Sequence, residues 1–226
     1  MNDALEAYAQ GREEAVLALT TDLGGEEEFP VRVFLRGPAE MDAVETRALG
    51  EAHGRVLDVG ACAGAHTLPL LERGLDVVAL DPLPAAVHLL RSRGVRDARR
   101  GTLESLDPEE RFDTILLLMN GTGLAGTLGR LSAFLGKAAA HLREGGGILV
   151  DSTDPRDWDP PGDGRYPGEL QYRLVFDDRT GPPFPYVFVD PETLAGAAFA
   201  ADLDTEILVS DPDGHYLARL TSFEAR

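Results

Sequence analysis

The chain has 226 residues, 43% of them hydrophobic, and a formal net charge of −18. This length suits one large domain or one domain with an insertion, and the negative charge argues against a nucleic-acid substrate because phosphate backbones would repel it. The single cysteine excludes an intrachain disulfide and fits a reducing compartment. With no apolar run of membrane-spanning length and no signal-peptide pattern, we expect a cytoplasmic protein.

The first fifty residues predict a cap of helical and extended segments. Apolar residues recur at near-helical spacing over residues 3–20, which predicts an N-terminal helix. Alternation over residues 29–35 indicates a short strand or extended arm. Pro38 then begins a second helix that is expected to end near Leu49. We therefore assign residues 1–50 to a cap that precedes the main domain.

A regular alternation of strands and helices follows. Apolar runs predict strands at residues 56–59, 77–80, 112–118 and 148–150, with a weaker one at 97–99. Helices are predicted between them at residues 65–73, 85–93 and 128–142, the last stopped by Gly145-Gly146-Gly147. Such alternation predicts a parallel sheet with helices on both faces, and the run Ile115-Leu-Leu-Leu118 indicates a central strand.

An insertion at about residues 152–188 interrupts this alternation. It begins with a loop rich in proline, glycine and aspartate. Two predicted strands, at residues 171–176 and 186–189, then form a hairpin. A helix beginning at Pro191 and an antiparallel pair at residues 205–209 and 216–221 complete the main domain, which we assign to residues 51–226.

Two acidic residues follow the first two strands of the predicted sheet. The first strand and its turn read Arg55-Val-Leu-Asp-Val-Gly-Ala-Cys-Ala-Gly64, and the second strand ends at Asp81. Glycines at a strand-to-helix turn allow backbone N–H groups to approach a ligand, and a carboxylate after the next strand accepts hydrogen bonds from ribose hydroxyls. The pattern therefore predicts a site for an adenosine-bearing cofactor.

The glycine spacing separates two classes of cofactor. A dinucleotide fingerprint needs glycines at positions 60, 62 and 65, and only Gly60 is present. Asp58 would also repel a pyrophosphate, whereas it could help to hold the ammonium group of S-adenosylmethionine. The spacing Asp58-x-Gly60-x-Cys62-x-Gly64 resembles the acid-x-Gly-x-Gly-x-Gly motif of class I S-adenosylmethionine-dependent methyltransferases, with Cys62 in place of the middle glycine.

Further segments extend this resemblance over roughly residues 50–221. Residues 112–121 resemble the family's fourth-strand motif, and residues 117–127 and 181–186 resemble a bacterial subgroup of mostly uncharacterised members. The resemblance implies an α/β, Rossmann-like, doubly wound and mostly parallel seven-stranded sheet. It also implies an antiparallel C-terminal strand pair, an inserted β-hairpin and an N-terminal helical lid over the cleft.

The resemblance implies four groups of cofactor contacts. The glycine-containing loop and the second strand supply Asp58, Gly60, Ala61, Cys62, Gly64, Asp81 and Pro82. The segment after the third strand supplies the adenine contact through Thr102, Leu103 or Glu104, and the fourth strand ends at Met119 and Asn120.

Candidate catalytic residues are Asn120, Asp151, Glu169, Tyr172 and His66. A general base is needed only if the acceptor arrives protonated, and Asp151, Glu169 or His66 could serve. Asp154, Asp157 and Asp159 lie in the proline-rich loop, and we expect them to be solvated rather than to bind a metal.

The predicted function is methyl transfer from S-adenosylmethionine to a small molecule by a monomer or homodimer. No Asn-Pro-Pro-Tyr sequence, which enzymes that methylate planar amino groups often carry, is present. Two alternatives are a non-catalytic S-adenosylmethionine-binding protein and an NAD(P)-dependent oxidoreductase. The missing glycines and the absence of a Tyr-x-x-x-Lys pair argue against the oxidoreductase.

Overall fold

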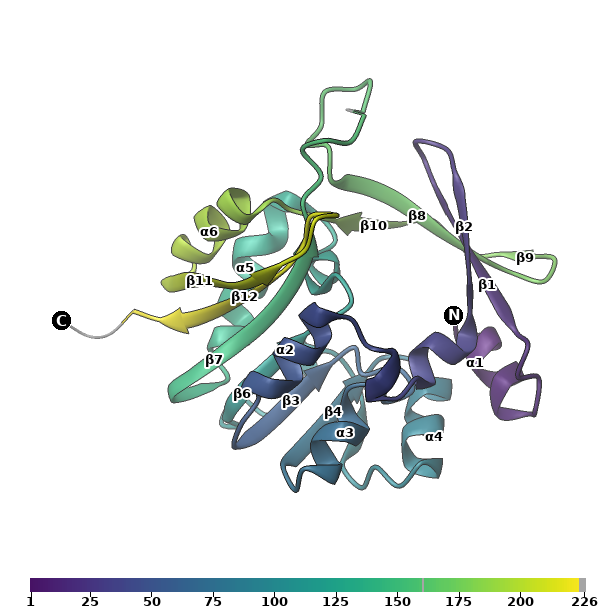
Figure 1. Ribbon diagram of the computed structural model, residues 1–226, viewed down its shortest axis with the longest axis horizontal. Coiled ribbons are helices and arrows are strands. Elements are labelled where there is room, and N and C mark those ends of the chain that lie inside the picture. Colours follow the sequence, from purple (N-terminus) through teal and green to yellow (C-terminus); the bar gives the residue numbers. More distant parts are fainter. Residues whose placement is uncertain (160, 224–226) are drawn as a thin grey trace.

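A seven-stranded sheet forms the centre of the molecule (Figure 1). The computed structural model describes residues 1–159 and 161–223; residue 160 of the predicted insertion and residues 224–226 of the predicted main domain lie outside the described residues. The sheet has the strand order β11-β12-β7-β6-β3-β4-β5. Its strands are β3 (Arg55–Val59), β4 (Asp76–Asp81), β5 (Ala98–Arg100), β6 (Phe112–Leu117), β7 (Leu142–Thr153), β11 (Leu203–Ser210) and β12 (His215–Ser222).

The direction of the strands confirms the predicted Rossmann-like fold. Strands β3 to β7 pair in parallel, and β12 is antiparallel to both β7 and β11. From β3 the chain moves through β4 and β5 to one side and through β6 and β7 to the other. Ligands of such sheets bind where the order reverses, beyond the carboxyl ends of the strands.

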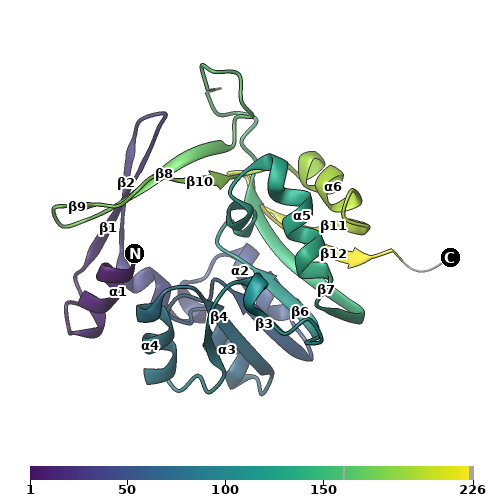
Figure 2. The same ribbon diagram turned by 180° about the vertical axis from the view of Figure 1, so that it is seen from behind.

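Helices cover both faces of this sheet (Figures 1 and 2). Helices α2 (Ala43–Glu51), α3 (Thr67–Glu72) and α4 (Pro84–Ser92) lie on one face, and α5 (Leu128–Ala139) and α6 (Pro191–Phe199) on the other. The side chains of Ile115, Leu116 and Leu117 in β6 are fully buried because this central strand faces helices on both sides.

A second sheet joins the N-terminal segment to the insertion (Figure 1). Strand β1 pairs antiparallel with β8 in the register Ala18 to Val175, although more than 150 residues separate them in the chain. The predicted pairing of the insertion strands is confirmed, with Phe184 opposite Tyr172. This cap sheet consists of β1 (Val16–Thr21), β2 (Glu26–Pro30), β8 (Glu169–Phe176), β9 (Arg179–Thr180) and β10 (Phe184–Val187).

Two predictions for the N-terminal segment were wrong. The N-terminal helix α1 covers only Asn2–Ala9, and part of the predicted helix forms β1 instead. Its residues Val-Leu-Ala-Leu-Thr-Thr suit a strand once β8 offers an edge to pair with, so tertiary pairing overrides the local periodicity. The predicted strand over residues 29–35 also ends early: Val31–Leu35 is a 3₁₀ helix with Val31 and Phe34 buried on one side.

Two predicted helix boundaries also moved. Pro38 begins a separate 3₁₀ turn, Pro38–Glu40, whereas α2 starts after Asp42, whose side chain caps it together with Glu45. The predicted stop at Gly145-Gly146-Gly147 was wrong, because these glycines lie inside β7. Helix α5 ends earlier, at Ala139, and β7 then begins at Leu142.

Candidate active site

The loop after β3 carries the glycine-containing part of the predicted cofactor site. Gly60 has a φ of 75° and its N–H donates to the Leu80 carbonyl at 2.8 Å, which joins the loop to β4. A Cβ at Gly60 would lie 3.8 Å from the Leu124 methyl groups, so the positive φ, and not crowding, is what favours glycine here. Cys62 occupies the position of the middle glycine and adopts a φ of 46°, a left-handed conformation that glycine adopts freely.

Two buried carboxylates flank this loop. Asp58 is 2% exposed and accepts a hydrogen bond from the Thr67 hydroxyl at 2.5 Å. Asp81 is 4% exposed and accepts from the backbone N–H groups of Cys62 at 2.9 Å and Leu83 at 2.8 Å. Burial raises the pKa of both carboxyl groups above the ordinary range. The structure thus places both acids at the carboxyl edge of the sheet, with Ala61, Cys62 and Pro82 beside them.

The segment after β5 lies next to this loop. Leu103 is buried at the start of a short 3₁₀ helix, and the Gly101 N–H donates to the Asp81 carbonyl at 3.0 Å. The Glu104 carboxylate already has two partners: it accepts hydrogen bonds from the Thr102 hydroxyl and from Lys137 of α5, each at 2.6 Å. The side chains of Thr102 and Glu104 are thus bonded to each other, and an adenine contact through this segment stays a prediction.

The turn after β6 has an unusual backbone. Met119 and Asn120 both have positive φ angles, 64° and 58°, and neither is glycine. Such conformations cost on the order of 1–3 kcal/mol each and persist only when neighbours hold them. The Tyr186 hydroxyl donates to the carbonyls of Met119 at 3.1 Å and Asn120 at 2.9 Å, and the Thr153 hydroxyl donates to the Asn120 side-chain oxygen at 2.9 Å.

Asp151 forms a hydrogen bond with the residue that follows this turn. Its side chain is fully buried at the end of β7, where one oxygen accepts the Gly121 N–H at 2.9 Å and the other lies 2.8 Å from His215 Nε2. Burial disfavours the charged imidazole, but Asp151, with Asp42 and Asp211, outweighs burial and raises the pKa of His215. Both carboxylate oxygens of Asp151 are thus engaged within the protein.

Aromatic side chains gather beside the Asn120 turn. The rings of Tyr172 and Tyr186 stack with centroids 4.9 Å apart, and Phe184, Phe188 and Trp158 extend the group through edge contacts. Gly123 makes room for this packing, since a Cβ there would lie 2.0 Å from the Tyr186 ring. Tyr172, a predicted site residue, therefore belongs to an aromatic wall formed by the cap sheet.

Glu169 and His66 have partners that sequence reasoning missed. The Glu169 carboxylate accepts from the Leu128 N–H at 2.8 Å and so caps the first turn of α5. His66 is 6% exposed at the start of α3, with its Nε2 2.6 Å from Glu45, which also pairs with Arg36. Arg36 in turn reaches the Met119 sulfur at 3.9 Å. The sequence carried no motif for this Arg36–Glu45–His66 cluster.

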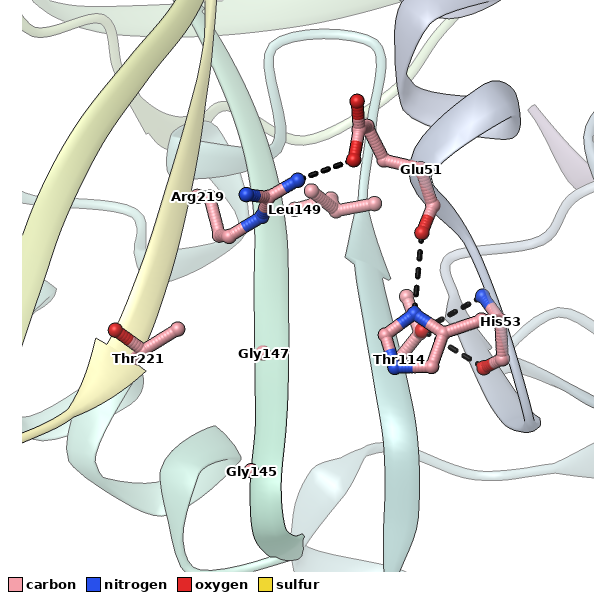
Figure 3. A pocket seen from close by; sticks show the side chains of 8 residues that line it. All are labelled: Glu51, His53, Thr114, Gly145, Gly147, Leu149, Arg219 and Thr221. Atoms are coloured by element: carbon pink, nitrogen blue, oxygen red, sulfur yellow. Dashed lines mark hydrogen bonds and ion pairs between the residues drawn. The ribbon is translucent and has the colours of Figure 1, made fainter. Parts of the chain in front are cut away.

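A pocket of about 390 Å³ lies away from these residues (Figure 3). Figure 3 shows Glu51, His53 and Arg219 around it, together with Gly145 and Gly147 from the early part of β7. None of the predicted site residues lines this pocket. Within residues 1–159 and 161–223, no cluster of three or more His, Cys, Asp or Glu side chains is arranged to hold a metal ion. In the same part of the chain, no helix has the length and hydrophobicity to cross a membrane.

The chemistry of the first site fits S-adenosylmethionine. Asp81 would accept hydrogen bonds from ribose hydroxyls, and the buried carboxyl group of Asp58 would accept from a ligand's ammonium group. When bound, this cofactor supplies an electrophilic methyl group on a sulfonium.

Comparisons with known proteins agree with this site. A family model described as "Methyltransferase domain" matches residues 56–146. A ubiquinone biosynthesis O-methyltransferase of Rhodopseudomonas palustris (strain BisA53) is 32% identical over 132 residues, and one of Bradyrhizobium sp. (strain ORS 278) is 36% identical over 109 residues. The matches cover 56% and 46% of this chain, and 47% and 41% of those relatives, so the chain spans less than half of their length.

Solved structures extend the likeness to nearly the whole chain. A methyltransferase from Bacteroides fragilis, solved in complex with S-adenosyl-L-homocysteine, is 35% identical with a TM-score of 0.89, covering 98% of this chain and 93% of that one. The Streptomyces venezuelae protein DesVI, at 17% identity and a TM-score of 0.62, shares the fold over 97% of both chains. The present chain therefore belongs to the class I S-adenosylmethionine-dependent methyltransferases.

Proposed function

We propose that this protein transfers the methyl group of S-adenosylmethionine to a hydroxyl oxygen of a small aromatic molecule. The observation that carries the methyl-donor part is the pair of buried carboxylates, Asp58 and Asp81, on either side of the Gly60 loop. The 35% identical Bacteroides fragilis methyltransferase, solved with S-adenosyl-L-homocysteine, supports it.

The aromatic wall supports the proposed acceptor. Tyr172 and Tyr186 stack beside the Asn120 turn, at the edge of the sheet where the acceptor must meet the methyl group. Flat aromatic side chains bind planar rings well. The choice of oxygen is supported by the relatives described as O-methyltransferases. Because a sulfonium is already activated, the residues here act mainly by positioning the acceptor and excluding water.

We also propose that the cap acts as a lid over this site. The 3₁₀ segment Val31–Leu35 is tied to the cofactor loop by Arg93, which donates to the carbonyls of Ala63 and Leu35. Phe34 and Cys62 belong to one apolar cluster with α1 and the cap sheet. The division into a cap and a main domain, the cytoplasmic location, the monomer or homodimer and the lack of a nucleic-acid partner stay predictions.

The first test is calorimetric titration of ligand-free protein with S-adenosylmethionine and S-adenosyl-L-homocysteine. Wild-type protein should bind both, and Asp81→Ala should weaken binding roughly tenfold to a hundredfold, because it removes charge-assisted hydrogen bonds to the ribose. Asp76→Ala is the matched control, since Asp76 lies at the other end of β4, with its side chain 69% exposed. Equal affinities of the Asp81 and Asp76 variants would refute the cofactor site.

The second test identifies the acceptor class. Protein with S-adenosylmethionine is incubated with catechols, simple phenols, aliphatic alcohols and amino sugars, and products are detected by the mass of one added methyl group. The proposal expects product from the aromatic hydroxyl compounds and loss of turnover in Tyr172→Ala with cofactor affinity retained. Methylation confined to amino sugars or aliphatic alcohols would contradict the aromatic acceptor while leaving the cofactor site intact.

A further inference from the structure

The strained turn at Met119 and Asn120 depends on a chain of buried polar contacts. Two consecutive non-glycine residues with positive φ need support from outside the turn. Part of that support is the Gly121 N–H, which follows the turn directly and donates to Asp151 at 2.9 Å. Because the Asp151 side chain is fully buried, the oxygen that does not bind Gly121 needs a hydrogen-bond donor, which also fixes the orientation of the carboxylate.

His215 is that donor. Its Nε2 lies 2.8 Å from the Asp151 oxygen that does not bind Gly121, and its Nδ1 lies 3.3 Å from Asp42, the capping residue of α2. Asp211 of the preceding turn accepts the His215 backbone N–H at 2.9 Å. Three carboxylates from β7, α2 and the β11–β12 turn thus surround one ring, and they favour an imidazolium that donates from both nitrogens.

We propose that His215 is a positioning residue for methyl transfer, which holds Asp151 against the Gly121 amide and so keeps Asn120 in its left-handed turn. This inference rests on the proposed function, because it places the acceptor at the Asn120 turn. In this role His215 needs no contact with cofactor or acceptor. It acts through Asp151, and the Tyr186 contacts to the same turn form the opposite support.

Two amide substitutions separate the contacts of His215. In His215→Gln the terminal amide nitrogen reaches about as far as Nε2, so it can still donate to Asp151. In His215→Asn the shorter amide reaches only the position of Nδ1, toward Asp42, and Asp151 loses its donor. Both variants are neutral, so they share the loss of charge and differ in which carboxylate keeps its donor: Asp151 in His215→Gln and Asp42 in His215→Asn. His53→Gln, at an exposed histidine outside this network, is the control.

The kinetic expectation is a loss of kcat that is much larger than the loss of cofactor affinity. His215→Asn should lower kcat for the aromatic acceptor by about 100-fold, because a misplaced acceptor-side turn spoils the attack geometry. The affinity for S-adenosyl-L-homocysteine should fall by about tenfold at most, since the Asp58–Asp81 loop is untouched and only the predicted contact at Met119 and Asn120 is disturbed. His215→Gln should recover most of the lost rate. Equal losses in the two variants, or unchanged kcat in His215→Asn, would overturn the proposal.

A structural readout works without any acceptor. In protein labelled with ¹⁵N-glycine and saturated with S-adenosyl-L-homocysteine, the Gly121 amide should exchange faster with solvent in His215→Asn than in His215→Gln or wild type. Asp42→Asn, which retains a good helix cap, should speed this exchange less than His215→Asn. If wild-type protein methylates no aromatic hydroxyl, the proposed function fails, yet the Gly121 signal still decides the positioning role. An unchanged Gly121 signal in His215→Asn would refute that role.

Discussion

Glu45 shows how a single residue ties the cap to the cofactor loop. Its carboxylate pairs with Arg36 at the end of the cap segment and with His66 at the start of α3, and all three side chains are at most 10% exposed. Burial alone would raise the pKa of Glu45, but hydrogen bonds from His66 and Arg36 outweigh burial and lower that pKa to about 2. The cluster is therefore held together only while Glu45 is ionised.

We expect Glu45→Gln to lower the free energy of unfolding at pH 7 by roughly 3 kcal/mol, because it leaves the buried Arg36 guanidinium without a counter-charge. The folded pKa of Glu45 lies below its ordinary value of 4.5, so its contribution is present above pH 4.5 and is lost as the pH falls toward 2. Urea unfolding between pH 7 and pH 3 measures this. Wild type should lose more stability over this range than the variant, and parallel curves would contradict the role of Glu45.

Sequence reasoning located residues well where a backbone pattern defines them. Asp58, Gly60 and Asp81 lie where the strand-to-loop pattern placed them, because the carboxyl ends of parallel strands meet at one edge. Arg36 and His215 could not be found in this way, since their partners lie on other elements and no spacing marks them. The sequence did draw attention to Tyr186, because it ends the stretch Gly181–Tyr186 that resembles a bacterial subgroup. Its contact with Asn120 could not be predicted, because that contact depends on the fold of the insertion.

At the scale of elements, the main sheet was predictable, whereas only the insertion strands of the cap sheet were. Most strands of the main sheet have an apolar run, which is a local signal, whereas the short edge strand β5 has the sequence Ala-Arg-Arg. Strand β1 is stabilised instead by pairing with β8, far away in the chain, so its local sequence alone suggested a helix. The ion pairs Arg12 to Asp177 and Arg179 to Asp3 join the same two regions.

The cap sheet should therefore respond as one unit to a change in β1. Leu17 is fully buried among residues of α1, β8 and the Val31–Leu35 segment, whereas its neighbour Val16 is 43% exposed. Leu17→Ala should cost about 3 kcal/mol, and Val16→Ala should cost about 0.5 kcal/mol or less. Hydrogen exchange should show faster exchange in β8 as well as in β1 for Leu17→Ala. Faster exchange in β1 alone would mean that the two halves of the cap are independent.

At the scale of the whole molecule, the cap and the main sheet share an apolar cluster that includes the cofactor loop. Residues of α1, α4 and the cap sheet pack together with Cys62 and Met119, so a ligand at the loop touches a cluster common to both parts. We infer that the two parts unfold together and that ligand binding stabilises both. Trp158, the only tryptophan, lies in the insertion against Phe188 and reports on the cap side, whereas circular dichroism reports on all helices and strands.

Urea unfolding followed by both signals tests this coupling. The Trp158 fluorescence and circular dichroism transitions should coincide, and free S-adenosyl-L-homocysteine at 100 times its Kd should raise the free energy of unfolding by about 2.7 kcal/mol in both. Asp81→Ala, at the same ligand concentration, should show a smaller gain because fewer molecules are bound. A fluorescence transition at a lower urea concentration than the circular dichroism transition, and at the same concentration with or without ligand, would show that the cap opens by itself. The stability of the lid would then depend on its own contacts and not on the cofactor.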